Sequence, residues 1–254
     1  MGKRVAYFVE GANCWKSADD LCSLEIARGR YYLSSHDGHA TLERPGKLSV
    51  DISSRSVPAK FVYDPLDTSP AAFERSNETV YHNDASHTQR FLVDQSSIRA
   101  QTLKQNGLVY ESEPFETEVE LTGYLRLVVW ISMDVPDTDF QVCIYELQHE
   151  YSSIILTDAM IRARYRNSLT TESLVVPGEI NRYEFDHFQF FARRIRKGSR
   201  LRLVLQCVNS IYWQKNYNSG GAVAQETAKD ARTAHVTVHQ NSRYPSFLEV
   251  PTVS

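Results

Sequence analysis

The sequence predicts an all-β protein built from two packed antiparallel sheets. About nine or ten short segments rich in β-branched and aromatic residues follow one another with turn residues between them. The clearest pair occupies residues 121–131 and 140–146, where apolar side chains recur at every second position, as a half-buried strand requires. The intervening residues 133–139 contain Pro136 and several aspartates, which are typical of a turn. Helical periodicity is confined to one brief segment, so a sheet-on-sheet architecture fits best.

The N-terminal part supplies the first of these strands. Residues 4–10 predict a strand because Val, Tyr and Val alternate with other side chains along it. The polar and acidic stretch 16–20 predicts a loop or a single helical turn. Residues 31–42 predict a hairpin, since Asp37 and Gly38 provide the positive φ that a tight turn needs.

The remaining elements follow from the same pattern. Further strands are predicted where alternation or β-branched residues recur, at residues 48–52, 60–63, 154–156, 159–165, 181–191, 201–208 and 234–238. A short helix is predicted at 97–104, ended by Asn106 and Gly107. Residues 216–229 are polar and contain glycine, which indicates a loop.

Composition excludes several classes of protein. An apolar fraction of 42% and a charged fraction of 23% permit a buried core, and the net charge of −3 gives no overall attraction to nucleic acid or to an anionic membrane. The first 30 residues lack the features of a signal peptide and no long apolar run occurs, so we expect a cytoplasmic protein. The four cysteines are too sparse for a disulfide framework and are expected to be free thiols.

An ordered set of short motifs carries a family resemblance. The motifs lie at residues 7–15, 63–65, 121–123, 137–140, 161–166, 176–179, 197–203, 239 and 245–251. Together they resemble the C-terminal domain of the X-Pro dipeptidyl-peptidase and CocE/NonD hydrolase family, a group that includes cocaine esterases and α-amino acid ester hydrolases. Two stretches depart from the family pattern. Residues 64–97 lack the Gly-rich stretch often found there, and residues 104–110 replace an Arg-Asp-Val-Leu run.

The resemblance narrows the fold to a jelly-roll β-sandwich of the galactose-binding-domain-like kind with an N-terminal strand and loop extension. It implies a joining segment with the first strands at residues 1–65, a long connecting loop at 66–105 and a jelly-roll core at 106–254. We expect these parts to form one compact domain, since sandwiches often reach this size. Met1 directly before the joining strand is expected to mark a start at, or a truncation to, a domain seam.

The resemblance also implies a role. In the family this domain is non-catalytic and packs on an α/β-hydrolase catalytic domain, which would be the partner here in cis or in trans, and it helps to form the substrate pocket. The family's serine nucleophile, acid and histidine lie in that missing domain. No catalytic, cofactor-binding or metal-binding residue is therefore carried over, and we expect this chain to be inactive alone although its relatives are peptide or ester hydrolases. A homo-oligomer stays an open alternative.

The residues give no catalytic signature of their own. An α/β-hydrolase nucleophile needs the G-x-S-x-G elbow, and neither Ser199 nor Ser219 has that context. His235 and His239 would lie on one strand face about 13 Å apart, too far for one metal ion. His36 and His39 flank a turn and are expected to be exposed.

The aspartates of the turn between the two central strands are a candidate cation site. Asp134, Asp137 and Asp139 cluster oxygen atoms as calcium prefers, although no bidentate Glu follows them. The favoured interpretation is turn capping, and calcium binding is left open.

Two further clusters keep alternatives open. Basic residues at 193, 194, 196, 197, 200 and 202 are expected to lie on a solvated sheet face or to pair with acids, and nucleic acid is not expected as a partner. Most of the aromatic residues are expected to be core or interdomain contacts, although Trp130, Tyr212 and Trp213 could form a sugar-stacking face. That feature favours the alternative function, a stand-alone carbohydrate- or ligand-binding jelly-roll module.

Overall fold

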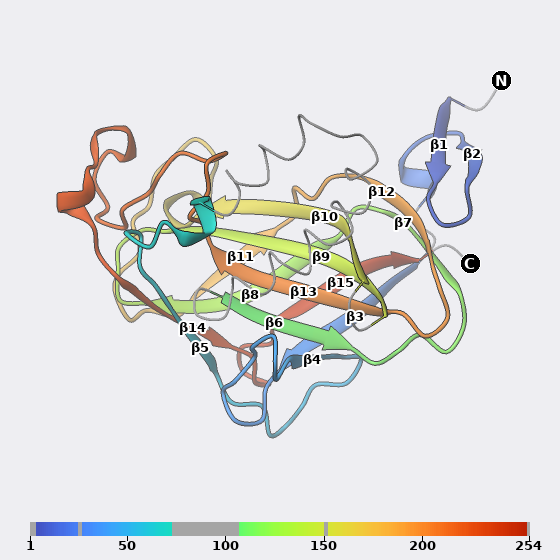
Figure 1. The fold of residues 1–254 in the computed structure, drawn as a ribbon, viewed down its shortest axis with the longest axis horizontal. Helices are drawn as coiled ribbons and strands as arrows, with labels where there is room; N and C mark the ends of the chain where they lie inside the picture. Colours follow the sequence, from blue (N-terminus) through green and yellow to red (C-terminus); the bar gives the residue numbers. More distant parts are fainter. Residues whose placement is uncertain (1–3, 25–26, 73–106, 150–151, 253–254) are drawn as a thin grey trace.

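The computed structural model describes residues 4–24, 27–72, 107–149 and 152–252 (Figure 1). The described strands are β1 Val5–Val9, β2 Cys14–Ala18, β3 Ala27–Ser34, β4 Gly46–Ser49, β5 Ala59–Tyr63, β6 Gly107–Ser112, β7 Val119–Gly123, β8 Arg126–Met133, β9 Asp139–His149, β10 Ser152–Arg162, β11 Asn181–Phe185, β12 Phe191–Ile195, β13 Arg200–Cys207, β14 Ala234–His239 and β15 Phe247–Thr252. Short 3₁₀ turns lie at Cys22–Leu24, Ala163–Tyr165, Val223–Gln225 and Ala228–Asp230. The predicted all-β class is confirmed.

The strands form a sandwich whose two halves belong to one hydrogen-bonded sheet. One half has the antiparallel order β10-β9-β13-β6, and these four strands run side by side in Figure 1. A parallel pairing of β6 with β4 leads into the other half, β4-β3-β15-β8-β14-β5, with β11 also paired to β8. Two small sheets, β12-β7 and the hairpin β1-β2, complete the fold. The hairpin lies at one margin of the molecule, near β12 and β7 (Figure 1).

One hydrophobic core fills the space between the halves. It joins Ile144 of β9 and Leu203 of β13 to Leu127 and Val129 of β8 and Leu248 of β15. The predicted inward set of the first central strand is thus confirmed, because alternate side chains point to one face of a sheet. In β9 both faces are buried, since Val109, Cys143, Tyr145 and Val204 form a second, smaller cluster.

Several predictions of local structure were wrong. Residues 16–20 are not a loop or helical turn at their start, because Cys14–Ala18 pairs with β1 over its whole length. The single strand expected at 121–131 is two strands, β7 and β8, interrupted at Tyr124 and Leu125. The stretch 181–191 is likewise divided: β11 ends at Phe185, and β12 begins at Phe191 in a different sheet.

Other elements agree, differ or lie outside the described residues. The strands at 60–63, 201–208 and 234–238 are confirmed as β5, β13 and β14. The hairpin predicted at 31–42 was wrong: only Tyr31–Ser34 is strand, as the end of β3, and it pairs with β4 rather than with 39–42, beyond the turn at Gly38 (φ +77°). The helix expected at 97–104, and most of the connecting loop expected at 66–105, lie outside the described residues.

Candidate functional site

A tight turn shapes the N-terminal hairpin. β1 and β2 pair in register from Val5 with Ala18 to Val9 with Cys14, and the connection passes through Gly11 (φ +76°) and Asn13 (φ +52°). A Cβ atom on Gly11 would lie 2.6 Å from the carbonyl oxygen of Arg194. Only glycine fits such a close approach in this backbone conformation.

Backbone bonds and buried charges fix the hairpin to the body. The amide of Glu10 donates to the carbonyl of Ala192 (3.0 Å), and the amide of Arg194 donates to the carbonyl of Glu10 (2.8 Å). The Arg193 guanidinium links the Glu10 carboxylate (3.0 Å) to Glu146, whose side chain is 0% exposed. The carboxylate of Glu146 also accepts bonds from the Ser199 hydroxyl (2.9 Å) and the Arg196 amide (3.2 Å). Because a buried carboxylate is stable only when it is paired and hydrogen-bonded, this cluster orders the hairpin together with β9 and β12.

The fixed hairpin presents an aromatic surface, which we call the hairpin face. Trp15 is 71% exposed and Phe8 41% exposed, and their rings pack edge to face at 5.6 Å. A groove of about 600 Å³ adjoins them, lined by Val5, Ala6, Tyr7, Phe8, Glu10, Trp15, Leu21, Tyr124, Ile155, Leu156, Phe190, Phe191, Ala192 and Arg193. Exposed apolar side chains gathered around a groove are typical of an interaction surface.

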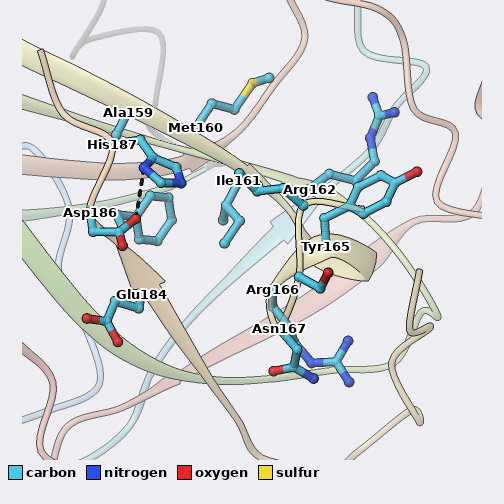
Figure 2. Close-up of a pocket in the computed structure, with 13 residues that line it drawn as sticks. Ala159, Met160, Ile161, Arg162, Tyr165, Arg166, Asn167, Glu184, Asp186 and His187 are labelled. Carbon is cyan, nitrogen blue, oxygen red and sulfur yellow. Dashed lines mark ion pairs between the residues drawn. The ribbon is translucent and has the colours of Figure 1, made fainter. Parts of the chain in front are cut away.

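A second cavity lies between β10 and β11 (Figure 2), at the other end of β10 from the hairpin (Figure 1). Its volume is about 350 Å³, and Figure 2 shows His187 facing Asp186, with Arg162 and Tyr165 on the opposite side. The charged groups of the lining already have partners. Arg162 makes a two-point ion pair with Asp139, and His187 Nδ1 lies 3.1 Å from Asp186. Apolar side chains such as Met160 and Ile161 share the lining with these paired charged groups.

Arginines hold two of the three aspartates of the central turn. The carboxylate of Asp137 accepts bonds from the amide and the side chain of buried Arg164 (2.9 and 2.8 Å), and Asp139 pairs with Arg162. Asn216 donates to both carboxylates, at 2.9 and 3.1 Å. Burial raises the pKa of Asp137, while Asn216 and Arg164 oppose that change. The Asn216 amide thus bridges the two carboxylates, and each carboxylate also pairs with its own arginine, which favours the turn-capping interpretation over a shared calcium ion.

The strand expected at residues 159–165 was also wrong at its end, because β10 stops at Arg162. Arg164 belongs to a 3₁₀ turn and is almost fully buried, since it pairs with Asp137 and donates to the carbonyl of Gly221 (2.7 Å). The third aspartate, Asp134, points elsewhere and lies 2.7 Å from His235 Nδ1 on the exposed surface.

The serines weighed as nucleophiles have structural partners. Ser199 donates to buried Glu146, and Ser219 donates to Glu226. A pair that the sequence did not suggest joins Ser132 Oγ to His239 Nε2 at 2.9 Å, across β8 and β14. Burial lowers the pKa of His239, and the charge of Lys60 lowers it further. In a catalytic triad the histidine is instead assisted by a carboxylate, which stabilises the imidazolium.

Two members of the basic cluster pair with acids, as predicted. Arg202 pairs with Glu111, and Arg200 pairs with Glu113. The three cysteines whose side chains are described, Cys14, Cys143 and Cys207, form no disulfide. Among the described residues, no group of His, Cys, Asp and Glu is arranged to hold a metal ion. None of the described helical segments has the length and apolar character of a transmembrane helix.

The sequence did not reveal the hairpin face or the buried cluster behind it. Trp15 stood within a family motif, but its exposure depends on neighbours that are distant in sequence. One signal was available for Glu146: a carboxylate that occupies an inward position of an otherwise apolar strand needs a buried partner.

The comparisons with known proteins agree on one family. Residues 2–249 match the family described as the X-Pro dipeptidyl-peptidase C-terminal non-catalytic domain. Cocaine esterase from Rhodococcus sp. (strain MB1 Bresler) is 26% identical over 252 residues, which cover 98% of this chain and 42% of that protein. Among solved structures, an aminopeptidase from the marine sediment archaeon Thaumarchaeota archaeon has a TM-score of 0.81 at 19% identity, covering 99% of this chain and 40% of its own. An α-amino acid ester hydrolase has a TM-score of 0.77 at 17% identity, covering 98% and 41%. The chain thus spans about two fifths of the length of these relatives.

Proposed function

Because the chain belongs to the family of X-Pro dipeptidyl-peptidase C-terminal non-catalytic domains, we propose that it docks through its hairpin face on the catalytic domain of a serine hydrolase. In this role it braces that domain and helps to enclose the substrate pocket. The complete enzyme would hydrolyse a peptide or an ester. This chain would supply packing and positioning, while the attacking serine and its partners belong to the catalytic domain.

The observation that carries the proposal is the rigid exposure of Trp15 and Phe8. A tryptophan that is 71% exposed, on a hairpin held by two backbone hydrogen bonds of Glu10 and by the Glu10–Arg193 ion pair, leaves a large apolar area in water. Burying such an area on a partner is favourable by about 25 cal/mol per Å². Tryptophans held rigidly at the centre of a patch are typical hot spots of protein interfaces.

The occupant follows from the family. Its members carry this domain at the C-terminal side, so their chain arrives from the preceding catalytic part through the segment that forms the hairpin here. The relatives have about 60% of their length outside the matched region, enough for a catalytic domain next to the hairpin face. A galactose-binding-like jelly-roll topology and a cytoplasmic location are part of the same proposal.

The docking test compares two tryptophans. We would express the catalytic domain adjoining this domain in the complete gene and titrate it with this chain. The substitution Trp15→Ser should weaken binding at least about tenfold, since hot-spot truncations cost 2 kcal/mol or more. Trp213→Ser is the matched control, because Trp213 is also exposed but lies on the loop after β13. Equal affinity of both variants would refute docking at the hairpin face.

A second assay tests the absence of chemistry. The isolated chain should not turn over an aminoacyl-proline anilide or an aryl ester. Turnover that disappears in Ser132→Ala and in His239→Ala would instead make that pair a nucleophile and its base, and would overturn the non-catalytic role.

The alternative function, a ligand-binding module, has one observation in its favour. Tyr212 and Trp213 are both exposed on one loop, as a sugar-stacking site requires. Quenching of tryptophan fluorescence by galactose, lost in Trp213→Ser, would support it.

A further inference from the structure

The hairpin face carries one carboxylate beside its two exposed rings. Phe8 and Glu10 are two residues apart on extended backbone, so their side chains point to the same side, about 7 Å apart along the chain. Trp15 is the cross-strand neighbour of Phe8 and shares that side. The Glu10 side chain is 62% exposed and lines the same groove as both rings. An acidic group and two aromatic rings therefore lie together on one open surface.

The negative charge of Glu10 is not fully neutralised within this domain. Its carboxylate and that of Glu146 share a single guanidinium, that of Arg193. Glu146 is fully buried and also accepts the bonds from Ser199 and the Arg196 amide, so it holds Arg193 firmly. Arg193 donates to only one oxygen of Glu10, Oε2 (3.0 Å), and no described residue donates to Oε1. The excess negative charge of this cluster thus lies on its most exposed member.

Docking would take this charge out of water. A partner that covers Trp15 and Phe8 also covers Glu10, because the three side chains line one groove. A carboxylate buried at an interface is strongly unfavourable unless a cation pairs with it. Lys16 cannot supply this cation, since it pairs with Glu120 on the opposite side of the hairpin. The partner must therefore bring a positive group to Glu10.

Given the docking proposed above, we infer that the hairpin face receives an arginine side chain of the catalytic domain, which pairs with Glu10 and stacks on Trp15. Arginine fits this surface better than lysine, because its planar guanidinium can bond to a carboxylate and lie against an aromatic ring at the same time. Arginine is also enriched in protein interfaces, whereas lysine is depleted.

The first test repeats the docking titration with the charge of Glu10 removed. Glu10→Gln keeps an oxygen that can accept the bond from Arg193, but docking should weaken at least about tenfold at low salt because the ion pair with the partner is lost. The affinity should also depend less on salt than that of the wild type, since one ion pair fewer is screened. A hairpin that was merely loosened would leave the salt dependence unchanged, and that result would overturn the proposal.

Glu113→Gln is the matched control for the change in net charge. The Glu113 side chain is 75% exposed and does not line the groove, so this variant should dock with wild-type affinity. Equal affinities of Glu10→Gln and Glu113→Gln would likewise overturn the proposal.

A second test identifies the cation of the partner directly. Phenylglyoxal, which modifies arginine, is applied to the free catalytic domain and to its saturated complex with this chain, and each modified peptide is quantified by mass spectrometry. One arginine of the catalytic domain should react at least about fivefold more slowly in the complex, because a desolvated and paired guanidinium is inaccessible to the reagent. Its reactivity should return in the complex saturated with Glu10→Gln. Equal protection by both chains, or protection of a lysine from acetic anhydride in place of an arginine, would exclude the arginine pair.

The docking and the arginine pair fail in different ways. If neither Trp15→Ser nor Glu10→Gln weakens binding, the hairpin face is not the docking surface and both proposals are wrong. If Trp15→Ser weakens binding while Glu10→Gln behaves like Glu113→Gln, the proposed function stands and only the arginine pair is wrong.

Discussion

Replacing Gly11 by alanine should release the N-terminal hairpin from the body of the domain. At φ +76° an alanine is strained, and its Cβ would meet the carbonyl oxygen of Arg194 at 2.6 Å. Real Cβ atoms do not approach an oxygen so closely, so the chain at Glu10 must move away from β12. That movement separates the two backbone hydrogen bonds that Glu10 makes with Ala192 and Arg194.

The expected cost is the sum of strain and lost bonds. A left-handed conformation costs an alanine about 1–2 kcal/mol, and each backbone bond contributes about 1 kcal/mol net, so Gly11→Ala should cost roughly 3 kcal/mol. Gly178→Ala is the matched control: Gly178 has φ +85°, but no atom lies within 4 Å of its Cβ position. There only the strain of about 1–2 kcal/mol applies.

Native-state amide exchange measures this difference where it arises. In Gly11→Ala, protection of the Glu10 and Arg194 amides should fall about a hundredfold, because local opening becomes easier by roughly 3 kcal/mol. In Gly178→Ala, protection of these two amides should stay at the wild-type level. Unchanged protection in Gly11→Ala would refute the view that this close approach fixes the hairpin.

Two further predictions concern charge. Arg193→Met leaves Glu146 buried without its counter-ion and should reduce the free energy of unfolding by about 3–5 kcal/mol in urea titration; a loss below 1 kcal/mol would contradict the cluster described above. Burial alone would raise the pKa of Glu249, but bonds from Arg30 and Arg126 hold that pKa below its ordinary value. Its stabilisation is therefore complete above about pH 4.5 and is lost as the pH falls through the lowered value. Acid unfolding of Glu249→Gln should accordingly depend less on pH than that of the wild type. An acid-unfolding profile identical to the wild type would contradict the lowered pKa of Glu249.

The sequence was informative where periodicity reflects the core. Alternate residues of β8, β13 and β14 enter the common core, because one face of each strand meets it. Burial alternates along β14, whereas β8 and β13 are also largely buried on their other face. β2 escaped prediction because its residues are polar or exposed, and it exists through its pairing with β1. Tertiary context of this kind overrides local propensity.

The hairpin face could not be predicted for a related reason. The exposure of Trp15 depends on which segments pack around it in the folded domain, and the sequence does not show this. From the sequence alone, an aromatic residue is more often expected to be buried. Arg193 was predicted to be solvated or paired with acids; it is paired, but buried. Arg193 is buried because it lies between Glu146 of β9 and Glu10 of the hairpin. These two segments lie far apart in the chain, so the sequence could not show that they come together.

The pairing of β3 with β15 has a consequence for biosynthesis. Tyr32 and Phe247 are direct neighbours in this ladder, and β15 also pairs with β8, so one half of the sandwich closes only around a strand near residue 250. Such long-range closure raises contact order and slows folding. During synthesis, the pairing edges of β3 and β8 stay open until β15 has emerged, and unpaired strand edges of this kind are prone to aggregation.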